Sequence, residues 1–214
     1  TTPVGATIDG TGDSLMFGLF NIAGSYTIQA TDLVTACVST MTGSAAINVN
    51  PLPAVFAVTG GGEYCDGDGG LALSLSGSET GIIYQLYRGG TPIAAPQVGT
   101  GGSISFGLIV DTVGTYVQVG KAYNSLTGCR SDMSGSATLI VNPLPNQFTV
   151  TGGGSFCSGG SGVNIGLTNS VIGTNYQLYN GATMVGAPMS GSSFALDFGM
   201  QSATGTYTVI ATDA

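Results

Sequence analysis

Hydrophobic and polar residues alternate with a period of two along much of the chain. Leu71, Leu73 and Leu75 alternate with alanine and serine, and residues 163–167 repeat this pattern. Such alternation is typical of β-strands that have one buried face and one solvated face. No segment shows the spacing of an amphipathic helix, so the pattern predicts an all-β protein.

The same pattern predicts seven short strands in the central part of the chain. They are expected at residues 54–59, 71–76, 82–88, a short segment ending by Pro96, 103–108, 115–122 and 136–141. Tyr84 and Leu86 are expected to point into the core and Tyr87 away from it. Short strands separated by turns over about 90 residues are typical of an antiparallel sandwich of immunoglobulin type.

A long sequence repeat divides the chain into modules. Residues 51–65 match residues 143–157 at ten of 15 positions, and the two segments are 92 residues apart. Residues 37–53 match 129–145 at 11 of 17 positions with the same spacing. A period of this size indicates tandem copies of a whole domain, and Pro-Leu-Pro reads as the linker that leads into each copy.

The repeat predicts three segments. Residues 1–50 correspond to the C-terminal part of one module, residues 51–142 to a complete module, and residues 143–214 to a module without its last strand. A piece of a longer array explains this organisation. The alternative is that strands from identical neighbouring chains complete the partial modules.

Two details of the sixth strand stand out. Tyr26, Tyr116 and Tyr207 follow Gly-Ser or Gly-Thr in the three copies, which predicts a corner tyrosine that hydrogen-bonds back to the backbone. Alternation from Tyr116 places the polar Gln118 inside the core, and a bulge or register slip is expected there.

Composition excludes several classes of function. Glycine accounts for 37 of 214 residues, only 7% are charged, and the net charge is −8. This acidic chain lacks the basic footprint of a nucleic-acid-binding protein. It has no 18-residue apolar run that would span a membrane, and 43% hydrophobic content with clear alternation indicates a folded chain.

The four cysteines occupy two positions of the repeat, because Cys37 matches Cys129 and Cys65 matches Cys157. Without histidine or a Cys-x-x-Cys motif, disulfides in an oxidising, extracellular setting are the better interpretation than zinc. Pairing Cys65 with Cys129 would close one module, leaving the partners of Cys37 and Cys157 outside the chain. Alternatively, Cys65 faces the matching loop of the next module and staples the array.

Other candidate chemistry is sparse. No histidine is present as a general base, so no catalytic residue and no cofactor are expected. Three acidic residues, Glu63, Asp66 and Asp68, are weak candidates for binding Ca²⁺, and solvated turn acids are the simpler interpretation. Tyr87 and Tyr179, if they face outward, are candidates for stacking on sugars or on neighbouring modules.

These motifs resemble a known kind of protein. The chain contains Asn50-Pro51-Leu52-Pro53, Tyr84-Gln85-Leu86-Tyr87, Gly114-Thr115-Tyr116 and Cys129-x-x-x-Met133. Over nearly its whole length it is similar to the tandem immunoglobulin-like and PKD-like repeats of giant Bacteroidota cell-surface adhesins, including gliding adhesins. The resemblance implies export by the type IX pathway. It also implies O-glycosylation of Asp-Ser/Thr-apolar triplets, which here contain Ser14 and Thr112.

The sequence therefore predicts a non-enzymatic, extracellular repeat array at the cell surface that forms a fibre or an adhesin stalk. Its expected partners are neighbouring modules of the same or identical chains, and surface glycans are a further candidate. The alternative is a set of carbohydrate- or ligand-binding accessory modules in a secreted multidomain protein. A binding module needs an exposed concave patch that a stalk does not need.

Overall fold

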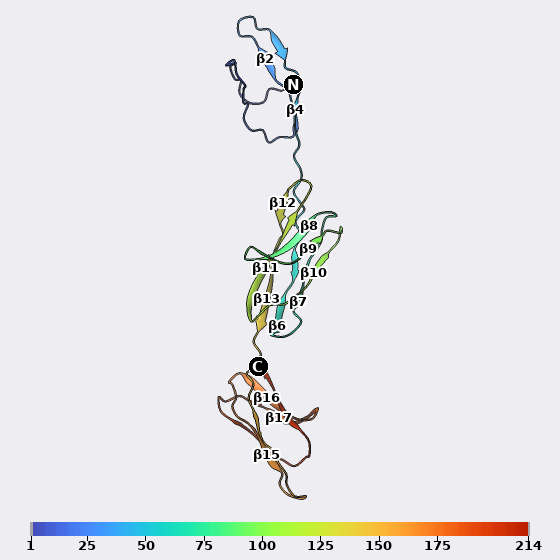
Figure 1. Cartoon of the computed structure of the whole chain (residues 1–214), viewed down its shortest axis with the longest axis vertical. Helices are drawn as coiled ribbons and strands as arrows, with labels where there is room; N and C mark the ends of the chain where they lie inside the picture. Colours follow the sequence, from blue (N-terminus) through green and yellow to red (C-terminus); the bar gives the residue numbers. More distant parts are fainter. Residues whose placement is uncertain (1, 214) are drawn as a thin grey trace. The chain divides into compact units, whose positions relative to one another are not determined.

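The computed structural model describes residues 2–213, and these residues form strands, turns and loops without a helix (Figure 1). None of the described residues belongs to a helix that is long and apolar enough to cross a membrane. The strands are β1 (Gly24–Tyr26), β2 (Gln29–Thr31), β3 (Val38–Thr40), β4 (Ala45–Ile47), β5 (Val58–Gly60), β6 (Gly62–Cys65), β7 (Leu71–Leu75), β8 (Ile83–Arg88), β9 (Thr91–Val98), β10 (Ile104–Ile109), β11 (Gly114–Tyr123), β12 (Arg130–Asp132), β13 (Ala137–Asn142), β14 (Val150–Gly152), β15 (Val163–Leu167), β16 (Thr174–Asn180), β17 (Thr183–Ser190), β18 (Leu196–Gln201) and β19 (Tyr207–Asp213).

The strands form several small sheets, most of whose described pairings are antiparallel. Their orders are β1-β4, β2-β3, β10-β7-β5, β6-β13-β11-β8-β9 with β12 on β11, β14-β15-β18 and β17-β16-β19. Only β6 and β13 form a parallel pair among the pairings described, together with one parallel bridge between Ala57 and Ser134. An all-β chain of antiparallel sheets is consistent with a β-sandwich, as the alternation predicted.

The described chain divides into two compact units. One contains residues 2–61, 72–109 and 117–138, and the other contains residues 62–71, 110–116 and 139–213. In the second unit, Leu167 of β15 and Leu196 of β18 pack in one cluster with Tyr176 of β16. Because β16 belongs to a different sheet from β15 and β18, this cluster lies between two sheets, which is the packing of a sandwich core.

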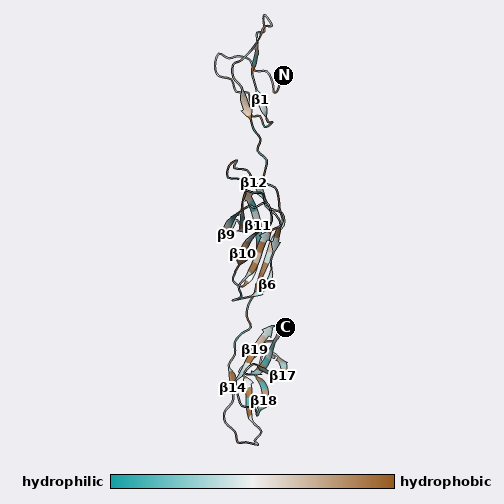
Figure 2. Ribbon diagram, turned by 90° about the vertical axis from the view of Figure 1, so that its right-hand side faces the viewer, coloured by the Kyte–Doolittle hydropathy of each residue, from teal (hydrophilic) through white to brown (hydrophobic). Residues whose placement is uncertain are grey.

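The predicted strands of residues 54–141 agree with the observed ones within a few residues. Leu73, Leu75, Tyr84 and Leu86 are all 0% exposed, as their inward phase predicted. Hydrophobic and hydrophilic residues share the same strands (Figure 2). Tyr87, expected to point outward, is half-buried.

Ala45, Ile47 and Val49 align with the buried Ala137, Leu139 and Val141 of β13, and this alignment predicts that they too face inward, but none of the three is buried. None of residues 2–50 is buried, and Val49 is 62% exposed. The reason is that this segment forms only the two-stranded pairs β1–β4 and β2–β3. A two-stranded pair has no second sheet to cover its apolar face.

The strand β6 was not predicted. It begins at Gly62, the last of three consecutive glycines, and pairs in parallel with β13. Gly61 makes this approach possible, because it has φ +94° and a Cβ built there would lie 2.5 Å from the Thr138 carbonyl oxygen. The glycine run therefore brings two backbones into contact.

The corner tyrosines are confirmed as hydrogen-bonding groups. The hydroxyl of Tyr26 donates to the Ile22 carbonyl and that of Tyr207 to the Ala203 carbonyl, each at 2.8 Å. In the remaining copy the Tyr116 hydroxyl lies 2.9 Å from the Thr112 hydroxyl.

Replacing Tyr207 with phenylalanine should lower the free energy of unfolding of the second unit by about 0.5–1.5 kcal/mol, the usual net value of one hydrogen bond. Tyr179→Phe is the matched control, since the Tyr179 hydroxyl makes none of the described hydrogen bonds. Urea unfolding of both variants measures the difference, and equal midpoints would show that the corner hydrogen bond contributes nothing.

Candidate functional site

The motif Tyr-Gln-Leu-Tyr, which occurs at residues 84–87 and 176–179, lies in the interior of the fold. Tyr84 is 0% exposed, and its hydroxyl accepts a hydrogen bond from the Glu79 backbone N–H at 2.8 Å. Tyr176 does the same for the Val171 N–H at 2.9 Å. Each tyrosine thus fixes the loop that precedes its own strand. In both copies the hydroxyl therefore binds a backbone N–H group of the same module.

The glutamine of the motif also serves the backbone. The side-chain amide of Gln85 donates to the carbonyl oxygens of Ile93 and Ala94, at 2.8 and 3.1 Å. Gln177 makes the equivalent contacts with Val185 and Gly186. Both glutamines lie at an irregularity in the pairing of their strand with the following strand. The amide therefore satisfies carbonyl groups that the interrupted ladder leaves available.

A repeated serine, which the sequence interpretation overlooked, fastens a second loop. Buried Ser78 donates to the Gly102 carbonyl at 2.6 Å and accepts from the Thr100 N–H at 3.0 Å. Ser170, 92 residues later, donates to the Phe194 carbonyl at 2.7 Å and accepts from Ser192 at 2.9 Å. Identity between the two copies was the available signal for this role.

Tyr87 and Tyr179, the candidates for stacking on sugars or on neighbouring modules, are both half-buried. The Lys121 ammonium lies 5.8 Å from the centre of the Tyr87 ring, and the same nitrogen forms an ion pair with Asp132 at 3.1 Å. The cation occupies one face of the Tyr87 ring, where a sugar would stack.

Two of the three acidic candidates for Ca²⁺ accept hydrogen bonds within the fold. The Asp68 carboxylate accepts from the Cys65 backbone N–H at 3.2 Å, and the Glu63 carboxylate accepts from the Asn142 side-chain amide at 3.4 Å. Over residues 2–213, no three histidine, cysteine or acidic side chains come together as a metal site. The structure therefore does not bring Glu63, Asp66 and Asp68 together as a set of Ca²⁺ ligands.

The two candidate glycosylation positions differ in their surroundings. Ser14 is exposed and directly follows a bend at residues 12–13. Thr112 is exposed too, but its hydroxyl contacts Tyr116 at the corner described above. Modification of Thr112 would compete with that contact, whereas modification of Ser14 would not.

The four cysteines have free thiols in this structure, and Cys65 and Cys129 have different neighbours. Cys65 ends β6 and aligns with Asn142 of β13. The Cys129 sulfur lies 3.9 Å from the Asn50 carbonyl oxygen. Cys129 therefore lies at the start of the predicted module 51–142, and Cys65 lies beside the residue that ends it.

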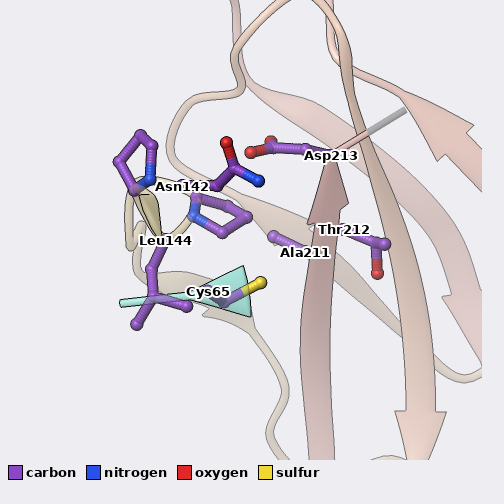
Figure 3. A pocket seen from close by; sticks show the side chains of 8 residues that line it. Cys65, Asn142, Leu144, Ala211, Thr212 and Asp213 are labelled. Atoms are coloured by element: carbon purple, nitrogen blue, oxygen red, sulfur yellow. The ribbon is translucent and has the colours of Figure 1, made fainter. Parts of the chain in front are cut away.

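One hollow of the second unit contains Cys65 (Figure 3). Its lining is formed by Cys65, Asn142, Pro143, Leu144, Pro145, Ala211, Thr212 and Asp213. Figure 3 shows the Cys65 sulfur pointing toward β19, which carries Ala211. The hollow joins the end of β6, the Pro-Leu-Pro segment and the end of β19. It contains no aromatic side chain on which a sugar would stack.

Burial perturbs one ionisable group of the repeated motif. Loss of water contact raises the pKa of Tyr84 above its usual value of 10.0, and the nearby Glu79 carboxylate acts in the same direction, against the hydrogen bond from the Glu79 N–H. The unfolded chain therefore releases this proton at lower pH than the folded chain.

The raised pKa of Tyr84 makes the free energy of unfolding depend on pH. The stability linked to Tyr84 is complete below about pH 10 and is lost as pH rises through the raised pKa. We expect the urea midpoint of the wild type to fall more steeply between about pH 9 and pH 11 than that of Tyr84→Phe. Identical slopes for the two chains would contradict this role of Tyr84.

No protein-family model matches the chain, and no curated protein matches it. A solved structure of Bacteroides ovatus, the mixed-linkage glucan utilization locus protein SGBP-B in complex with a mixed-linkage heptasaccharide, is similar over 83% of this chain and 50% of that one. The two are 13% identical with a TM-score of 0.26. The chain thus matches about half the length of that protein.

Proposed function

We propose that this chain is a non-enzymatic, extracellular repeat array that acts as a fibre or an adhesin stalk. Its units are immunoglobulin-like sandwich modules of about 92 residues, with boundaries at 1–50, 51–142 and 143–214. Adjacent modules of the same chain, or of identical chains, are its main partners.

One observation carries the proposal. Three pairs of polar residues that recur between the copies bind the backbone of their own fold: Tyr84 and Tyr176, Gln85 and Gln177, Ser78 and Ser170. A site for a ligand or for catalysis would repeat polar groups that point outward or converge in a cavity. Repetition of these internal contacts fits selection for the module itself.

Pulling on a single tethered chain tests the modular array. We expect one unfolding step that releases the complete module, about 90 residues or roughly 300 Å of extended chain at 3.3–3.6 Å per residue. A step that releases the whole chain at once would contradict separate modules. A gradual extension without steps would contradict them as well.

Binding of soluble and surface glycans tests the alternative function, an accessory module that binds carbohydrate. We expect no saturable binding on a glycan array. Saturable binding that is lost in Tyr87→Ala and Tyr179→Ala, and retained in Tyr123→Ala, would favour the binding module over the stalk.

A further inference from the structure

The repeated cysteines lie beside the residues at which the predicted modules begin and end. Cys65 aligns with Asn142 in the β6–β13 ladder, and the Asp66 N–H donates to the Asn142 carbonyl at 2.8 Å. Cys65 is therefore held beside Asn142, the last residue before Pro143-Leu144-Pro145.

Cys129 has the corresponding relation to the preceding linker. Its sulfur contacts the Asn50 carbonyl, and the Ser131 hydroxyl donates to the Pro53 carbonyl at 2.7 Å. Asn50 is the last residue before Pro51-Leu52-Pro53. Cys129 is therefore fixed to the linker that opens its own module.

Asn50 and Asn142 are the same position of the repeat, 92 residues apart. A cysteine of the Cys65 type lies beside this asparagine from the module that ends there. A cysteine of the Cys129 type lies beside it from the module that begins there. At each junction of two modules, one cysteine of each type therefore lies beside one asparagine.

The hollow in Figure 3 also supports the placement of a Cys65-type and a Cys129-type cysteine near each other at a module junction. Cys65 shares it with Ala211, Thr212 and Asp213 at the end of β19. The repeat aligns Tyr207 of β19 with Tyr116 of β11, and Cys129 follows the end of β11 by six residues. In a complete array, the strand that ends at this hollow leads within one turn to the next cysteine.

Pairing within one module conflicts with the strand register. The chain around Cys129 lies beside Asn50 and Pro53, whereas Cys65 lies beside Asn142. The extended strand Ala137–Asn142 alone covers roughly 17–20 Å at about 3.3 Å per residue. A disulfide requires Cα atoms within about 7 Å.

We propose that a disulfide joins the Cys65-type cysteine of each module to the Cys129-type cysteine of the following module. This inference rests on the proposed tandem array. The oxidant is a low-molecular-weight disulfide. The first protein thiolate attacks it and releases one small thiol, and the second thiolate attacks the mixed disulfide and releases the other. Two protein thiols are thereby oxidised and one small disulfide is reduced.

The pairing gives the array a second covalent connection. Each bridge would close a loop of about 155 residues, longer than the 92-residue period, so successive loops overlap. Every backbone bond between the first and last bridges then lies inside at least one loop. A single proteolytic cut leaves such a stalk in one piece, which suits a fibre exposed outside the cell.

The test adds one cysteine to the full chain. A second copy of residues 124–142 after Ala214 continues the repeat and supplies a second Cys129 in the third module. With Cys37, Cys129 and Cys157 replaced by serine, only Cys65 and the added cysteine remain. After oxidation by glutathione disulfide, trypsin cleaves after Arg88, Lys121, Arg130 and the arginine that follows the added cysteine. We expect the fragment ending at Arg88 to remain joined to the fragment ending at this added arginine until the disulfide is reduced.

The matched control retains Cys157 in place of Cys65, which leaves the pair that lies within one module. We expect no intramolecular bridge in this control. A bridge in the control and none with Cys65 would overturn the pairing while leaving the array intact. The original chain offers a further check, since a monomeric disulfide between Cys65 and Cys129 would also overturn it.

Failure of the array itself has a different signature. Hydrogen exchange in the extended chain should protect Gly154–Cys157, the counterpart of β6, because the added segment contains the counterpart of β13. Without that protection the modular organisation fails, and the proposed bridge fails with it. Protection without a Cys65 bridge overturns the bridge alone.

Discussion

Gly61→Ala should destabilise the first unit by about 2–5 kcal/mol. Gly61 has φ +94°, which costs an alanine about 1–2 kcal/mol. A Cβ at this position would lie 2.5 Å from the Thr138 carbonyl oxygen and 3.2 Å from the Thr138 nitrogen. Because both neighbours are backbone atoms of β13, the strand itself must move, which adds about 1–3 kcal/mol.

The chain contains a matched control for this prediction. Gly153 is the same position of the repeat, with φ +83°, and a Cβ there would meet nothing within 4 Å. Gly153→Ala should therefore cost only the backbone strain, about 1–2 kcal/mol. The difference between the two variants isolates the close approach of the strands.

Urea unfolding followed by circular dichroism, together with hydrogen exchange at Gly62–Cys65, measures both effects. We expect loss of exchange protection in β6 for Gly61→Ala and unchanged protection for Gly153→Ala. Equal destabilisation by the two substitutions would mean that the approach of residue 61 to β13 has no energetic importance.

Arg88→Asn should lower the free energy of unfolding by about 1–3 kcal/mol, because it leaves a buried amide without its partner. Gln118 is 0% exposed. With its amide oxygen directed toward Arg88, this oxygen accepts from Nε at 3.2 Å and from Nη2 at 3.3 Å. The guanidinium thus compensates a polar side chain at a core position of β11.

The third copy of the repeat supplies the compensating change. Asn180 stands where the complete module has Arg88, and Val209 stands where it has Gln118. The double variant Arg88→Asn/Gln118→Val therefore introduces a pair that already occurs in this chain. We expect it to recover most of the stability that Arg88→Asn loses, because valine needs no hydrogen-bond partner.

A double-mutant cycle with Arg88→Asn, Gln118→Val and the double variant measures the coupling. We expect a coupling energy of about 1–2 kcal/mol, in the range found for residues in contact. Additive single effects would contradict the pairing of the two side chains. The free energy of unfolding of the double variant, compared with that of the wild type, also shows whether the fold requires the polar Gln118.

The sequence by itself determined the all-β class, most strand positions and the inward phase of residues such as Leu73 and Tyr84. These features follow from period-two alternation, which each strand carries locally. Alternation also placed Gln118 inside, and the repeat of Gly-Thr-Tyr identified the corner tyrosine. Each of these conclusions needs only near neighbours in sequence or comparison with the next copy.

Only the tertiary structure decided where residues far apart in sequence meet. Glycine has no side-chain period, so the run ending in Gly62 could not reveal that β6 joins β13. Residue type alone did not show that Arg88 compensates Gln118, or that Cys65 and Cys129 lie beside equivalent asparagines of successive linkers. Such relations depend on strand register, which long-range pairing sets and which no local pattern encodes.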